Sequence, residues 1–157
     1  MIMKQTGLTL IELVVTMAVI SLLLVMGVPQ FQTTTANSRL TTTINKLTGD
    51  LAFARTEAIK RGVSVAVTAS NNNWVNGWTT AVTISGATEN LRLSPALTAD
   101  VALTTSGVNA IQFNADGRST ASVDFTLCDD RSGSFGKKLS LSTTGQTFLE
   151  VKQSCNP

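Results

Sequence analysis

Hydrophobic residues run almost without interruption from Leu8 to Val28, near the start of the chain. The run reads LTLIELVVTMAVISLLLVMGV, and its one charged residue is Glu12. As a helix with about 1.5 Å of rise per residue it would span about 31 Å, which matches the hydrocarbon core of a bilayer. The run is too long for a signal-peptide core, and no small-residue cleavage site follows it. The pattern predicts a retained single-span anchor, and Lys4 ahead of it favours a cytoplasmic N-terminus.

After Pro29 the pattern becomes that of an amphipathic helix. Apolar residues recur at intervals of three and four, at Leu40, Ile44, Leu47, Leu51, Ala54 and Ala58. This spacing places them on one helix face, which we expect to pack against a head domain. Cations at Lys60 and Arg61, followed by Gly62, are typical of a helix C-terminus. One long helix is therefore predicted from about Leu8 to Arg61.

From Val63 onward the hydrophobic period changes to two, which is typical of half-buried strands. We expect roughly seven or eight short, mostly antiparallel strands. The candidate segments are residues 63–68, 78–84, 90–93, 101–104, 110–114, 121–127, 139–142 and 148–152. Asn-Gly, Asp-Gly and Thr-Gly pairs at residues 76–77, 116–117 and 144–145 are turn signals between them. The predicted fold class is α+β, with one long helix packed on a β-sheet head.

Composition narrows the possible functions. Only 14% of the residues are charged and 24 of the 157 are Thr, which favours a β-rich domain outside the cytoplasm. The absence of His and Tyr excludes Ser-His-Asp and Cys-His catalytic arrangements and histidine metal sites. The formal net charge of +2 does not by itself indicate a nucleic-acid partner. We therefore expect no catalytic residue, no metal and no cofactor, and the chain is not predicted to be an enzyme.

The residues around the charged position carry a recognisable motif. The segment KQTGLTLIE, residues 4–12, joins a short basic leader, a glycine, a hydrophobic residue and the string TLIE. It resembles the leader and cleavage site of type IV pilins and type II secretion pseudopilins. The resemblance implies that residues 1–7 are a leader removed by a prepilin peptidase between Gly7 and Leu8, and that the new amine of Leu8 is methylated. It also implies a membrane and assembly helix at residues 8–29 and a periplasmic pilin-like head at residues 30–157, with helix 30–61 and β-rich region 63–157.

Glu12 has a role implied by the same resemblance. An ionisable group inside a membrane span costs several kcal/mol unless it is paired or shielded. In this family the glutamate pairs with the N-terminal amine of a neighbouring subunit, here that of Leu8, and fixes the register of assembly. The implied partners are other minor and major pilins or pseudopilins, the prepilin peptidase and the inner-membrane assembly platform. The implied location is the inner membrane and then the pilus or pseudopilus, at its tip.

Two further motifs narrow the family. The strings LAFARTEAIKR at residues 51–61 and WVNGW at residues 74–78 resemble the A-R-x-E-A-I signature and the W-x-x-G-W hairpin of the GspH/FimT/FimU group of minor pilins and pseudopilins. On chemistry alone, Arg55 and Glu57 are interpreted as a solvated helix face. The tryptophans Trp74 and Trp78 are interpreted as hairpin core packing. The motifs therefore identify the group and predict no chemistry.

Cys128 and Cys155 belong to the part that would be exported. In an oxidising periplasm we expect them to form a disulfide that fastens the final strands to the sheet, and a free thiol pair is the alternative.

Three functions occur within this group. They are a structural, priming minor pilin of the FimU kind in a tip complex, a GspH-like minor pseudopilin of type II secretion, and a FimT-like DNA-binding pilin for transformation. DNA-binding relatives carry a G-R-x-R motif, whereas the aligned turn here has Gln146 and Phe148 in place of both arginines. Arg118 is a weaker DNA-binding candidate, because it is a lone arginine after a turn. Lys137 and Lys138 would supply charge nearby, but adjacent lysines on a strand point to opposite faces. The first function, most like FimU, is favoured.

Overall fold

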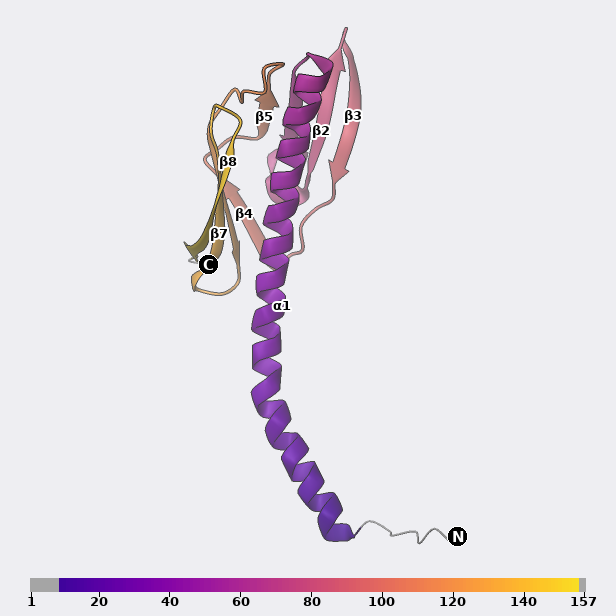
Figure 1. Ribbon diagram of the computed structural model, residues 1–157, viewed down its shortest axis with the longest axis vertical. Coiled ribbons are helices and arrows are strands. Elements are labelled where there is room, and N and C mark those ends of the chain that lie inside the picture. Colours follow the sequence, from indigo (N-terminus) through magenta and orange to yellow (C-terminus); the bar gives the residue numbers. More distant parts are fainter. Residues whose placement is uncertain (1–8, 156–157) are drawn as a thin grey trace, which may run out of the picture. The chain divides into compact units, whose positions relative to one another are not determined.

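The computed structural model describes residues 9–155, without the side chains of residues 25–30. It contains one long helix, two short 3-10 helices and eight strands (Figure 1). The chain divides into two units, one ending at Asn37 and the other beginning at Ser38. The predicted boundary between residues 29 and 30 stays a prediction.

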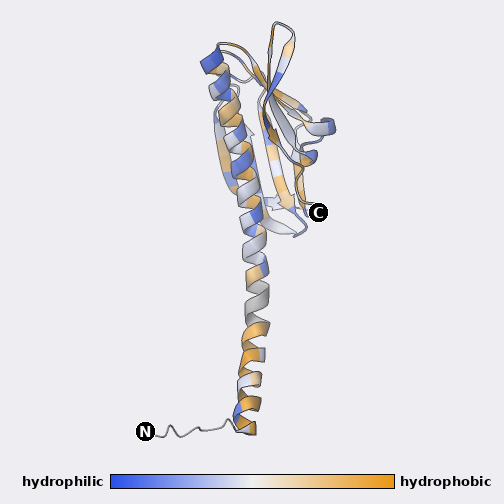
Figure 2. Ribbon diagram, turned by 90° about the vertical axis from the view of Figure 1, so that its right-hand side faces the viewer, coloured by the Kyte–Doolittle hydropathy of each residue, from blue (hydrophilic) through white to orange (hydrophobic). Residues whose placement is uncertain are grey.

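The first unit holds the N-terminal part of helix α1 (Leu10–Arg61). Thr9 caps this helix, because its Oγ1 accepts a hydrogen bond of 3.3 Å from the backbone nitrogen of Glu12. The Thr-x-x-Glu spacing is that of a capping box. Every residue from Leu10 to Leu24 is exposed, so apolar side chains cover all faces of this segment. In Figure 2 the ribbon of this segment is mostly orange, the colour of hydrophobic residues. Among the described residues, no helix has the length and apolar character needed to cross a membrane.

The second unit contains two four-stranded antiparallel sheets. Their strand orders are β3-β2-β1-β5 and β4-β6-β7-β8. The strands are β1 (Val65–Ala69), β2 (Trp78–Ile84), β3 (Ala87–Ser94), β4 (Val101–Thr105), β5 (Ala110–Phe113), β6 (Val123–Asp129), β7 (Gly133–Leu141) and β8 (Thr147–Cys155). The 3-10 helices, Ser70–Asn72 and Trp74–Asn76, connect β1 to β2. The predicted α+β class with antiparallel strands is confirmed.

The core lies where the apolar face of α1 meets both sheets. The predicted stripe is confirmed, since every member of it is at most 1% exposed: Leu40, Ile44, Leu47, Leu51, Ala54 and Ala58. One hydrophobic cluster joins these side chains to alternating residues of both sheets, such as Val67 and Phe125. Figure 1 shows β2 and β3 on one side of the helix and β7 and β8 on the other. Burying each large apolar side chain contributes about 1.5–3 kcal/mol, so this contact stabilises the head.

A buried polar network ties α1 to the first sheet. Asp50 is 2% exposed, and its Oδ2 accepts hydrogen bonds from Nε1 of Trp78 (2.9 Å) and Oγ of Ser94 (2.6 Å). Its Oδ1 accepts a bond of 2.8 Å from Arg92, whose guanidinium carbon lies 4.1 Å from the ring centre of Phe53. Burial raises the pKa of the Asp50 carboxyl, but the bonds from Arg92, Ser94 and Trp78 outweigh it and lower that pKa overall.

The tryptophans pack as predicted. Trp74 and Trp78 are 2% and 1% exposed. Nε1 of Trp74 donates a hydrogen bond of 2.7 Å to the carbonyl of Val108. The rings of Trp74 and Phe125 pack edge to face, with their centroids 4.9 Å apart. Both residues are therefore structural.

The interpretation of Glu57 as part of a solvated face is wrong. Glu57 is only 9% exposed, because Arg61 and Lys60 lie over its carboxylate at 2.8 and 3.5 Å. Arg61 also reaches Glu89 of β3 at 2.8 Å. The hydrogen bond from Arg61 lowers the pKa of Glu57. Arg61 therefore joins the last turn of the helix to the first sheet, since it contacts both carboxylates.

The predicted disulfide is confirmed. Cys128 of β6 and Cys155 at the end of β8 are bonded, with their Cα atoms 5.8 Å apart. The bond passes over β7 at Gly136, where an added Cβ would lie 2.9 Å from the carbonyl oxygen of Gln153. Only glycine fits between the two bridged strands. The disulfide thus fastens the C-terminal strand across its neighbour.

Replacing both Cys128 and Cys155 with serine is expected to lower the free energy of unfolding by about 3–4 kcal/mol, since the unfolded chain loses a loop constraint. The measurement is a denaturant midpoint for the purified protein. Reduced wild type should unfold at the same denaturant concentration as the double variant. A reductant should leave the variant unchanged, and equal midpoints for oxidised wild type and variant would contradict the expectation.

Candidate functional site

The residues predicted for processing and assembly fall at the N-terminus. Gly7 and Leu8 lie outside the described residues, so cleavage and methylation stay predictions. Glu12 is exposed in the first turn of α1, where the helix dipole favours a negative charge. It is the only ionisable residue between Thr9 and Leu24. An isolated carboxylate on an apolar surface is available to a cation brought by another molecule.

The cations predicted as weak DNA contacts do not form one patch. Arg118 is exposed on the turn after β5, and Ser119 beside it donates its backbone N–H to the carbonyl of Thr143 at 3.1 Å. Lys137 lies six residues before Thr143 along the chain, about 20 Å away at the rise of a strand. Lys138 pairs with Asp124 at 3.1 Å, which raises the pKa of the lysine. Each phosphate contact adds only a modest increment to the affinity for DNA, so scattered cations make a poor DNA-binding surface.

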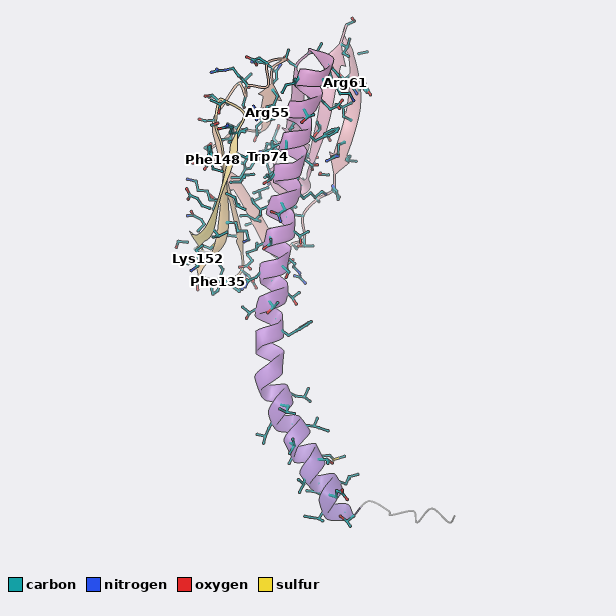
Figure 3. The ribbon with its side chains drawn as sticks, in the orientation of Figure 1. Arg55, Arg61, Trp74, Phe135, Phe148 and Lys152 are labelled. Carbon is teal, nitrogen blue, oxygen red and sulfur yellow. A yellow bond between two sulfur atoms is a disulfide. The ribbon has the colours of Figure 1, made fainter. Side chains whose placement is uncertain are left out.

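The turn aligned with the G-R-x-R motif borders a cavity. This cavity of about 440 Å³ lies between α1 and the start of β8. Its lining residues are Ala52, Arg55, Thr56, Gly145, Gln146, Thr147 and Phe148. Gln146 is exposed, and Phe148, which Figure 3 labels, is 58% exposed, so both positions of the missing arginines are accessible.

Arg55 is the residue that the sequence analysis missed. Its Nε is buried and has no hydrogen-bond partner among the described residues, so the solvated-face interpretation is wrong here too. Two glycine turns cover it, because a Cβ on Gly117 or Gly145 would lie 3.2 or 3.0 Å from that nitrogen. Both glycines have a φ of 77°, a backbone conformation that favours glycine. The sequence identified both turns, but nothing in it shows that they meet on the helix.

The described residues hold no group of three or more His, Cys, Asp or Glu side chains placed to bind a metal ion.

Comparison with known proteins gives two family matches. A family model described as Type II transport protein GspH matches residues 43–145, and one described as Prokaryotic N-terminal methylation motif matches residues 2–28. The first match lies within the unit that begins at Ser38, and the second lies within the unit that ends at Asn37. No curated protein matches the chain.

Two crystal structures of the type IV minor pilin FimU from Pseudomonas aeruginosa are similar to this chain, each at 25% sequence identity. One has a TM-score of 0.66 and covers 78% of this chain and 98% of that chain. The other has a TM-score of 0.63 and covers 74% of this chain and 100% of that chain. The likeness therefore extends over nearly all of the first FimU structure and all of the second.

Proposed function

The chain belongs to the GspH family of minor pilins and pseudopilins, a structural and not an enzymatic family, and on that premise we propose that it is a priming subunit of a type IV pilus tip complex. One observation carries the proposal. The segment from Leu10 to Leu24 exposes apolar side chains on every face, with Glu12 as its single charge. Such a surface must be covered by lipid or by other apolar helices.

The proposed sequence of events follows from this surface. The segment lies in the inner membrane with the head in the periplasm, and a peptidase removes residues 1–7. The amine of Leu8 on a neighbouring subunit then pairs with Glu12 as the helices pack together. Pairing two charges in an apolar bundle fixes the register, because an unpaired charge there is costly. The likeness to FimU over nearly its whole chain supports a pilus over a secretion pseudopilus.

The proposal is tested on the filaments of the producing cells. Sheared pili should contain this chain in small amounts, and mass spectrometry should find its N-terminal peptide beginning at methylated Leu8. Deleting the gene should reduce the number of pili per cell. A Gly7→Arg variant should keep residues 1–7, because the side chain obstructs close backbone approach at the cut. Normal piliation with blocked protein secretion would instead support the pseudopilin function.

DNA binding is expected to be weak. The purified chain should show no duplex binding tighter than micromolar at about 150 mM salt, where surface charge is well screened. Replacing both Gln146 and Phe148 with arginine should strengthen binding, because both positions are exposed. A gel-shift titration measures this, and Lys152→Arg serves as a charge-conserving control. Micromolar binding by the wild type, abolished by Arg118→Ala, would make DNA capture the primary function.

A further inference from the structure

Arg55 differs from three other arginines of the head. Arg61, Arg92 and Arg131 each hold a carboxylate at 2.6–2.8 Å. The Nε of Arg55 is buried and has no hydrogen-bond partner among the described residues. Burying a donor of a charged group without an acceptor costs free energy. The Nε is therefore not explained by the stability of the isolated head. Because Arg55 also lines a cavity, its guanidinium is available there to an acceptor from outside.

The surroundings of Arg55 form a shaped recess. The turns at Gly117 and Gly145 leave no room for a side chain above its Nε. They fix the guanidinium at the wall of the cavity of about 440 Å³. Thr56 and Gln146 line the same cavity. The recess thus offers one fixed cation with a few polar groups around it.

One cation with an apolar border suits a protein carboxylate better than a nucleic acid. A planar guanidinium pairs with a carboxylate through two parallel hydrogen bonds. The cavity lining contains no second cation, whereas binding to a phosphate backbone needs several. Phe148 borders the cavity, and Leu149 and Val151 follow it along β8, the outer strand of its sheet. These three side chains are 58%, 45% and 61% exposed.

We propose that the Arg55 cavity binds an aspartate or glutamate side chain of a neighbouring pilin subunit, and that apolar residues beside that acid cover Phe148. The inference rests on the proposed function and names the chemistry of the neighbour. Arg55 is then a docking residue of the head, separate from the assembly contact of Glu12. Figure 3 shows Arg55 on α1 and Phe148 on β8, with Lys152 further along the same strand.

The test uses the full chain in the cells that assemble it. A photo-crosslinking benzoylphenylalanine at Gln146 should, on irradiation, form an adduct with another filament subunit. Mass spectrometry should place the adduct at a segment containing an acidic residue. Arg55→Gln should reduce the adduct at least about tenfold, as expected for the loss of one charge-assisted pair. Arg55→Lys should retain part of it, and Lys152→Gln, which removes a cation elsewhere on β8, should leave it unchanged.

Three results separate the possible outcomes. Because Nε of Arg55 has no partner, Arg55→Gln should leave the melting temperature of the purified chain unchanged or higher. A lower melting temperature together with a lost adduct would assign Arg55 a structural role and overturn the proposal. An adduct to DNA, an adduct that survives Arg55→Gln, or no adduct in a chain present in filaments would also overturn it. Absence of the chain from every filament would refute the proposed function itself.

Discussion

Asp50→Ala is expected to lower the free energy of unfolding by about 3 kcal/mol. The substitution leaves Nε1 of Trp78 and Oγ of Ser94 buried without an acceptor. Arg92 contributes less to the loss, because its side chain is 46% exposed and water can solvate it. Urea unfolding followed by tryptophan fluorescence measures the change, since Trp78 donates directly to this carboxylate.

Asp130→Ala is the matched control, because Asp130 is exposed just after β6 and should change stability by at most about 0.5 kcal/mol. The effect at Asp50 should also depend on pH. The pKa of the folded carboxyl is lowered, so its contribution is complete above the ordinary carboxyl pKa and is lost as the pH falls through the folded value. The difference between wild type and Asp50→Ala should therefore shrink in acid. A difference that is constant down to low pH would contradict the charged network.

Glu12→Ala is expected to leave membrane insertion intact, because the span becomes more apolar. Incorporation into filaments should fall at least about a hundredfold, since removing one partner of a buried pair costs about 3–5 kcal/mol. Immunoblots of sheared filaments against the membrane fraction measure this ratio. Thr16→Ala, one turn further along the same helix, should incorporate normally.

A second variant separates assembly from helix capping at Glu12. The backbone nitrogen of this residue bonds Thr9, so Glu12 also belongs to a local capping motif. Glu12→Gln keeps the side-chain length and the capping chemistry but removes the charge. It should fail to incorporate as Glu12→Ala does. Normal incorporation of Glu12→Gln would show that capping, and not pairing with the amine of Leu8, is what assembly needs.

The long helix and the strands were predictable because their hydrophobic periods are clear. Strand β7 shows where this signal ends. It begins at Gly133, whereas alternation predicted a start only at residue 139, because two glycines, a serine and two lysines interrupt the pattern in its first part. Pairing with β8 supplies the hydrogen bonds that the pattern does not reveal. The division into two sheets likewise depends on pairings between distant strands, which periodicity does not contain.

The buried charges were not predictable from the helix pattern. Asp50, Arg55 and Glu57 mostly lie off the apolar stripe, so a solvated position was the natural expectation. Asp50 and Arg55 are instead covered by chain that arrives from far along the sequence, by Ser94 and Gly145 respectively. Glu57 is covered by Lys60 and Arg61 of its own helix turn. A helical wheel reports which face is apolar. It does not report how far around the helix the sheets and turns extend.

The bond between Cys128 and Cys155 also determines what a protease can remove. The loop after β6 and the turn before β8 both lie between the two cysteines. A single cut at either place leaves both fragments covalently attached to the head. A nicked subunit would therefore migrate as an intact chain on a non-reducing gel and separate only after reduction. A nick at these loops alone would not release the C-terminal strand from a filament in an oxidising compartment.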